Sequence, residues 1–144
     1  MKKFLLFFLL LFVLVGCSDK VSLKGRVTFS DDGSPVKAGT VCFVNGVFQA
    51  TGKLNSEGYY VVGTDKASDG LPLGIYKVYI AEAKQQKGTK KVPQLDIDGT
   101  RKEVDEPVYE ELVDRKFCNA ETSGLTFEVK GSSIFDFKVD RLKQ

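Results

Sequence analysis

The fold of this chain is decided by residues 125–129, which read LTFEV, and by residues 135–139, which read FDFKV. In both stretches apolar residues alternate with polar ones, as expected for a β-strand that buries one face and exposes the other. Gly131 and Ser132, which favour turns, lie between the two stretches. The pattern therefore predicts two consecutive strands that each contribute one face to a hydrophobic core.

The same signal recurs five times toward the amino terminus. Turn-forming clusters such as residues 31–35 (DDGSP) and 55–58 (NSEG) separate these segments. One apolar face per segment is typical of a sandwich rather than of a parallel sheet that is covered on both sides. With the two stretches above, the sequence predicts an all-β sandwich of about seven strands within residues 21–144. The five further segments are 24–29, 40–44, 48–54, 59–63 and 75–81.

Residues 83–107 interrupt this pattern. Their first half carries a run of lysines, and their second half is rich in aspartate and glutamate. Few of these residues are apolar, so the segment offers little to a core. We therefore expect a long, mobile polar loop at the surface.

The amino terminus resembles the signal peptide of a bacterial lipoprotein. Two lysines precede an apolar run at residues 4–15, which would form a helix of about 18 Å, short for a membrane core of about 30 Å. Residues 14–17 (LVGC) resemble a lipobox, which implies cleavage between Gly16 and Cys17 and lipidation of the Cys17 thiol. The predicted organisation is a signal peptide at 1–16, a lipidated tether at 17–20 and the sandwich at 21–144.

This resemblance also implies a location. The membrane is then a partner through the lipid on Cys17, and the chain belongs to the cell envelope. In lipoproteins of the Gram-negative type, an aspartate directly after the lipidated cysteine tends to retain the protein in the inner membrane. Here Ser18 occupies that place and Asp19 comes one position later. The resemblance therefore favours the outer membrane, on its periplasmic or its surface face, over the inner membrane.

The order of short motifs in the mature chain resembles the carboxypeptidase regulatory-like domain, a transthyretin-like (prealbumin-like) β-sandwich. The ending of the chain is similar to that of a group of predominantly uncharacterised small bacterial lipoproteins with this fold. The resemblance implies a fold and brings no catalytic residues. The matching stretches are 25–27 (GRV), 33–36 (GSPV), 38–43 (AGTVCF), 51–60, 74–78 (GIYKV), 107–109 (PVY), 122–129 and 135–137.

Composition excludes several functions. Subtracting Lys2 and Lys3 from the 21 basic residues leaves 19, which equals the 19 acidic residues, so nucleic acid is not expected as a partner. The chain has no histidine, the commonest general base and zinc ligand. We therefore expect a non-enzymatic lipoprotein with a structural or binding role, without a catalytic residue, metal or cofactor. The sequence does not name its ligand; an envelope protein and a glycan are the candidate partners.

Two alternatives remain open. Exposed tyrosines could stack on sugar rings, which would make the chain a carbohydrate-binding module at the cell surface. Paired carboxylates in or beside the polar loop could serve an envelope enzyme. Residues 96–99 (DIDG) resemble the start of a calcium loop, but Arg101 occupies the place of its required glycine. The residues concerned are Tyr59, Tyr76, Tyr79 and Tyr109 for sugars, and Asp96, Asp98, Glu110 and Glu111 for catalysis.

Lipidation of Cys17 would leave Cys42 and Cys118 as an even pair of cysteines in an oxidising compartment. Cys42 lies between two residues expected to face the core, so its side chain should point to the outer face of its strand. A disulfide between the two is one reading, and two unpaired thiols are the other.

Overall fold

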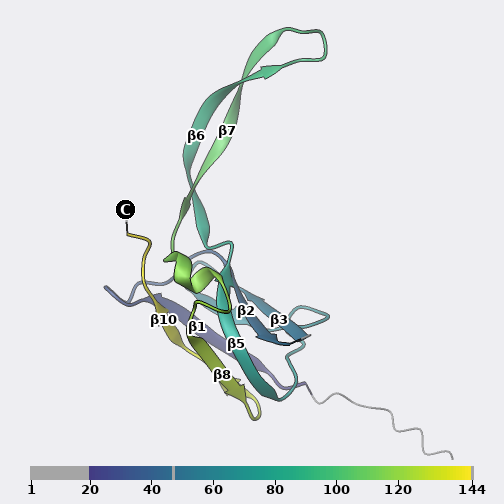
Figure 1. Cartoon of the computed structure of the whole chain (residues 1–144), viewed down its shortest axis with the longest axis vertical. Coiled ribbons are helices and arrows are strands. Elements are labelled where there is room, and N and C mark those ends of the chain that lie inside the picture. Colours follow the sequence, from purple (N-terminus) through teal and green to yellow (C-terminus); the bar gives the residue numbers. More distant parts are fainter. Residues whose placement is uncertain (1–19, 47, 144) are drawn as a thin grey trace, which may run out of the picture.

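The hydrophobic core lies between two β-sheets, and a long two-stranded hairpin projects from one end of them (Figure 1). This architecture comes from a computed structural model, which describes residues 20–46 and 48–143. Each of the seven predicted segments contains a strand, so the all-β sandwich is confirmed. The first sheet contains β1 (Leu23–Phe29), β4 (Tyr59–Val61), β9 (Ser133–Ile134) and β10 (Phe137–Val139); the second contains β2 (Thr40–Asn45), β3 (Phe48–Lys53), β5 (Gly74–Ala81) and β8 (Leu125–Val129).

The first sheet is built around β1. On one edge β4 runs antiparallel to it, with Gly25 opposite Tyr60. On the other edge β9 and β10 run parallel to it, with Val27 opposite Phe137. This parallel pairing joins the first strand of the domain to the last and holds Phe137 and Val139 against the core.

The second sheet is antiparallel, in the order β3-β2-β5-β8. Val41 and Phe43 of β2 lie opposite Ile80 and Val78 of β5, and all four side chains are buried. Tyr76 on the same strand is also buried. The apolar faces predicted for these two strands are therefore confirmed.

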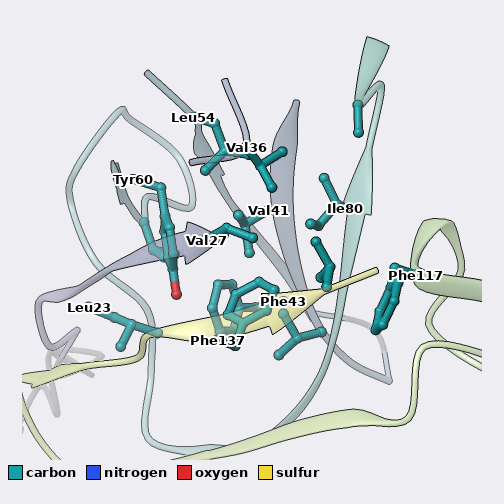
Figure 2. Close-up of a cluster of buried hydrophobic side chains, with 14 of the residues drawn as sticks. Leu23, Val27, Val36, Val41, Phe43, Leu54, Tyr60, Ile80, Phe117 and Phe137 are labelled. Carbon is teal, nitrogen blue, oxygen red and sulfur yellow. The ribbon is translucent and has the colours of Figure 1, made fainter. Parts of the chain in front are cut away.

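Phe43 occupies the middle of the core, beside Phe137 of the opposite sheet (Figure 2). Its ring lies between 6.1 and 6.4 Å, centroid to centroid, from the rings of Tyr60, Tyr76 and Phe135. Pairs of this kind contribute about 0.5–1.5 kcal/mol each beyond the burial of their area. Because the chain has no tryptophan, this aromatic cluster supplies much of the volume between the sheets.

A close backbone approach at Gly25 joins β1 to the segment between β9 and β10. The carbonyl oxygen of Phe135 lies only 1.9 Å from where a Cβ on residue 25 would stand. That carbonyl accepts a hydrogen bond of 2.6 Å from the Tyr60 hydroxyl, and the Phe135 amide donates to the carbonyl of Lys24 at 2.9 Å. Burial raises the pKa of Tyr60, so its hydroxyl keeps the proton that it donates. Only glycine fits at this position of β1.

The structure contradicts the polar loop predicted at residues 83–107. These residues belong to a hairpin of β6 (Lys84–Leu95) and β7 (Arg101–Glu111), which we call the arm. The prediction failed because both faces of the arm are largely exposed, so its strands lack the alternation of apolar and polar residues that a half-buried strand shows. The expectation that this segment adds little to the core is confirmed, since nearly all of its residues are exposed.

Candidate functional site

The two strands of the arm carry opposite charges. β6 has four lysines and no acidic residue, whereas most charged residues of β7 are acidic. Lys90 lies directly opposite Glu106, with 3.3 Å between the ammonium and a carboxylate oxygen. Lys87 and Glu110, and Lys91 and Glu103, form ion pairs of 3.5 Å. Exposed pairs of this kind contribute about 0–1 kcal/mol each, so they select the partner strand and its register more than they stabilise the arm.

The two faces of the arm differ in character. One face, which we call the valine face, carries Val92 directly opposite Val104 and, further toward the sandwich, Val108 opposite Gly88. The same face also carries the charged residues Lys90, Lys102 and Glu106. Val104 is 37% exposed and Val108 is 36% exposed. The other face places four charged side chains around two prolines. These charged residues are Lys91, Arg101, Glu103 and Asp105.

The tip of the arm is a tight turn. The Asp96 carbonyl accepts from the Gly99 amide at 2.9 Å, and the Asp96 amide donates to the Thr100 carbonyl at 2.8 Å. Gly99 has a φ of 82°, the left-handed conformation that a three-residue hairpin loop requires at this place. The Asp98 carboxylate accepts from the amide of Thr100 at 3.0 Å. Both aspartates predicted as candidates for chemistry therefore hold the turn.

The Ile97 amide donates to the Asp96 carboxylate at 2.9 Å, whereas the Ile97 side chain is fully exposed. A shallow hollow of about 330 Å³ lies beside it, and Val104 lines that hollow. The hollow therefore connects the valine face to the tip of the arm through a mixture of apolar and polar side chains. The hollow is lined by Gln94, Leu95, Asp96, Ile97, Lys102 and Val104.

A proline on each edge of the arm disfavours pairing with a further strand. The Asp96 amide points toward the partner strand, where it donates to the Thr100 carbonyl. Along an antiparallel ladder every second amide points this way, so the backbone nitrogen of Pro93 on β6 points away from β7, to the free edge of the hairpin. Pro107 of β7 lies opposite Thr89 and occupies an outward position by the same count. Because neither proline nitrogen faces the partner strand, the hairpin loses no internal hydrogen bond. Each proline leaves one free edge of the arm without a hydrogen-bond donor at that position.

The arm leaves the sandwich at the far end of β5 from the amino-terminal segment. Val21 pairs with Leu71, shortly before β5 begins, whereas β6 starts shortly after β5 ends. Eight residues of β5 separate the two points by about 26 Å at about 3.3 Å per residue. The base of the arm is fixed by buried Ala83, whose carbonyl accepts from the Leu112 amide at 2.7 Å.

Removing the arm should leave the sandwich folded. We expect that replacing residues 86–109 by an Asn-Gly turn changes the free energy of unfolding by less than about 1 kcal/mol, because an isolated two-stranded ribbon with exposed ion pairs is itself marginal. Chemical denaturation of both chains measures this difference. A loss of several kcal/mol would show that the arm packs on the core.

A second surface surrounds Tyr59 on the outer face of the first sheet. Its ring is 48% exposed, and the Arg26 guanidinium lies 5.0 Å from the ring centroid. The Arg26 Nε donates to the Glu57 carbonyl at 3.0 Å, which fixes the guanidinium in place. Hollows of about 300 and 320 Å³ lie beside this ring, and Val61 lines both. The first hollow also has Lys24 and Asp136 at its wall.

The other tyrosines singled out from the sequence are placed differently. Tyr76 is a core residue, and its hydroxyl donates to the Pro72 carbonyl at 2.9 Å. Tyr79 is half-buried on the outer face of β5. Tyr109 is exposed near the base of the arm, with the Lys84 ammonium 5.7 Å from its ring centroid. Of the four, Tyr59 combines an exposed ring with two adjacent hollows.

The acidic residues proposed for catalysis are not brought together. Glu110 and Glu111 lie near the base of the arm, opposite Gln85 and Lys84, whereas Asp96 and Asp98 lie at its tip. The Lys102 ammonium holds the pKa of Asp96 below its usual range, and the Thr100 hydroxyl does the same for the pKa of Asp98. Among the described residues, no group of three potential metal ligands is present.

Cys42 and Cys118 are free thiols in the structure, and the predicted disulfide between them stays a prediction. Cys42 points to the outer face of β2 as predicted, yet it is only 2% exposed between Thr51 and Tyr79 on the neighbouring strands. Cys118 ends a short 3-10 helix, η1 (Arg115–Cys118), and is exposed. Burial raises the pKa of both thiols.

Most of the predicted amino-terminal sites lie outside the described residues. These are the signal peptide at 1–16, the cleavage site at Gly16 and Cys17, and the first part of the tether. The described chain begins at Lys20, whose ammonium pairs with Asp65 and lies 2.8 Å from a carboxylate oxygen of Asp69. Within residues 20–46 and 48–143, no helix has the length and hydropathy needed to cross a membrane.

Comparison with known proteins adds only weak likenesses. No family model matches the chain, and no curated protein matches it. The chain resembles part of the crystal structure of BcpA, the major pilin subunit of Bacillus cereus, with 10% identity over 84% of this chain and a TM-score of 0.37. A 9R-lipoxygenase from Cyanothece gives 11% identity over 83% of the chain and a TM-score of 0.34. The chain spans 30% and 16% of these two proteins, and the scores carry no argument about function.

Proposed function

We propose that this protein is a non-enzymatic lipoprotein of the cell envelope, in which the sandwich holds the arm away from the membrane for binding. The observation that carries the proposal is the position of the arm, at the opposite end of β5 from the amino-terminal segment. In Figure 1 the chain enters at one end of the sandwich and the arm extends from the other. A lipid at Cys17 would therefore direct the arm outward.

The sequence supports the membrane anchor. Residues 14–17 (LVGC) follow a short apolar run, as in lipoproteins that are cleaved before the cysteine. The motif order of the mature chain further supports assignment to the carboxypeptidase regulatory-like, transthyretin-like sandwiches found among such lipoproteins. The outer membrane remains the proposed location, because Ser18 rather than aspartate follows Cys17.

The tether would hold the sandwich close to the bilayer. Three residues from Cys17 to Asp19 reach at most about 10 Å when extended. At Lys20 the chain is held on the sandwich by Asp65 and Asp69. The Asp65 carboxylate raises the pKa of Lys20, and the Lys20 ammonium lowers the pKa of Asp69, so both groups stay charged at neutral pH. The arm, about 40 Å long with twelve residues in β6, would then extend into the space beyond.

The test of this proposal is metabolic labelling with radioactive palmitate, followed by membrane flotation of the full chain. We expect the label to co-migrate with the protein in the membrane fraction. Unlabelled protein in the soluble fraction would overturn the proposal.

A second candidate function is carbohydrate binding at the Tyr59 surface. The observation that favours it is the half-exposed Tyr59 ring between two hollows, since aromatic rings stack on sugars and flanking polar groups can bind hydroxyls. We expect a glycan array to detect binding that Tyr59→Ala abolishes and Tyr109→Ala retains. Equal binding by both variants, or no binding by the unmodified protein, would exclude this candidate.

A further inference from the structure

We infer that two copies of this chain, anchored in one membrane, pair through the valine faces of their arms. The inference rests on the proposed function for the direction of the arms, and it names the partner of the arm as a second copy.

The arm needs a covering partner to be stably ordered. A two-stranded ribbon alone is marginal in water, because neither of its faces is shielded. Nearly all residues of β6 and β7 are exposed, and apart from its base the arm does not rest on the sandwich. The valine face is where a cover would have the largest effect, because Val104 and Val108 are each more than one-third exposed there. Full burial of an apolar side chain of this size contributes about 1.5–3 kcal/mol, so covering the exposed third of each valine contributes about 0.5–1 kcal/mol.

A second copy fits this face by symmetry. If a two-fold axis runs along the arms, β6 of one copy lies over β7 of the other. Lys90 then faces the partner's Glu106, and Val92 faces the partner's Val104. The apolar pair therefore forms a four-valine layer, and the Lys90 and Glu106 charges form an alternating ring. Both arms point the same way along this axis, which suits two copies that are anchored in one membrane.

The other surfaces of the arm fit a second copy less well. The opposite face has no pair of apolar side chains opposite each other, and it carries four charged residues against three on the valine face. Edge pairing would require the outward donors that Pro93 and Pro107 lack. Insertion of the tip into lipid would bury Asp96 and Asp98 beside Ile97, at about 3 kcal/mol for each aspartate against about 0.5 kcal/mol gained from isoleucine. The valine face is therefore the surface that a second copy would cover.

The contact is small, so it depends on the membrane. Residues 88–94 span about 23 Å, and a two-stranded ribbon is about 10 Å wide, which gives roughly 500 Å² for both copies. Stable complexes of soluble proteins bury about 1,200–2,000 Å². Anchoring both copies in one leaflet raises their effective concentration and orients the arms, which compensates for a small contact. We therefore expect pairs in membranes and monomers in dilute solution.

Site-directed cross-linking in intact membranes tests the inference. Cys118→Ser removes the exposed thiol, while Cys42 is buried. In that background, Val104→Cys places a thiol on the valine face, and Asp105→Cys places one on the opposite face of the same strand. A short bis-maleimide matches the roughly 10 Å between packed sheets. We expect covalent dimers from Val104→Cys and only background from Asp105→Cys.

A second pair of variants tests the same contact without moving the cross-linking thiol from residue 104. Adding Val92→Asp to the Val104→Cys chain should abolish the dimer, whereas adding Thr89→Asp, on the opposite face, should retain it. Palmitate label and membrane flotation are measured on the same samples. If the protein is labelled and membrane-bound but Val104→Cys gives no dimer, or no more than Asp105→Cys, the pairing is wrong. If the protein is unlabelled and soluble, the proposed function itself fails.

Discussion

Gly25→Ala is expected to destabilise the sandwich by about 3–5 kcal/mol, a large share of the roughly 5–15 kcal/mol by which a domain is normally stable. The added methyl group would stand 1.9 Å from the carbonyl oxygen of Phe135, so the backbone between β9 and β10 must move away. That movement breaks the hydrogen bond from the buried Tyr60 hydroxyl and loosens the parallel pairing of β1 with the end of the chain. Denaturation in urea, monitored by circular dichroism, measures the loss.

Gly131→Ala is the matched control for this substitution. Gly131 lies in the turn between β8 and β9, and beyond its chain neighbours no atom lies within 4 Å of the place that a Cβ on residue 131 would occupy. We expect a change of at most about 0.5 kcal/mol there, as for most surface substitutions. Equal stability of the two variants would show that β9 and β10 do not hold β1 in the way described.

Cys17→Ala is expected to abolish lipidation completely and to release or mislocalise the protein. The thiol of residue 17 is the only atom in the proposed lipidation motif that can receive the diacylglyceryl group, and alanine offers none. Two or three acyl chains hold a protein firmly, since each buried methylene contributes about 0.8 kcal/mol. Without them, only the apolar run at residues 4–15 is left to hold an uncleaved chain, and that run is short for a membrane core. Palmitate labelling and membrane flotation measure the loss, with Cys118→Ala as the control that should keep both label and membrane. Label retained on the Cys17→Ala protein would place the lipid elsewhere.

The strands of the sandwich could be predicted because each buries one face. In β1, Val27 and Phe29 turn inward while Arg26 and Thr28 alternate with them, and the sequence shows that period directly. The same holds for Tyr76 and its neighbours on β5. The hairpin of the arm was not predicted because its strands bury neither face, so lysine and glutamate occur on both faces alike. Its pairing signal lies in opposite charges such as Lys90 and Glu106, and it becomes visible only once the register is known.

Other features depend on neighbours that are distant in the sequence. The parallel contact of β1 with β10 joins strands more than one hundred residues apart, and alternation within a strand says nothing about which strand will pair with it. Cys42 was predicted on an outer face, but its burial comes from Thr51 and Tyr79 on adjacent strands. Of the candidate binding residues, Tyr59 was identified as an aromatic side chain, whereas the hollows beside it arise from the packing of several elements.

Pro93 and Pro107 also bear on how copies of this protein would interact if many of them were anchored in one membrane. Membrane-bound proteins that expose bare strand edges are held at high local density, where growth of a sheet from copy to copy is a polymerisation hazard. Pro93 and Pro107 interrupt the donor row on each edge of the arm, so an added strand at either edge would lack a hydrogen bond at the proline. Lateral growth is thereby discouraged at both edges, while the flat face remains available. If the protein is anchored and paired as proposed, contacts between arms end at small closed assemblies instead of extending from copy to copy.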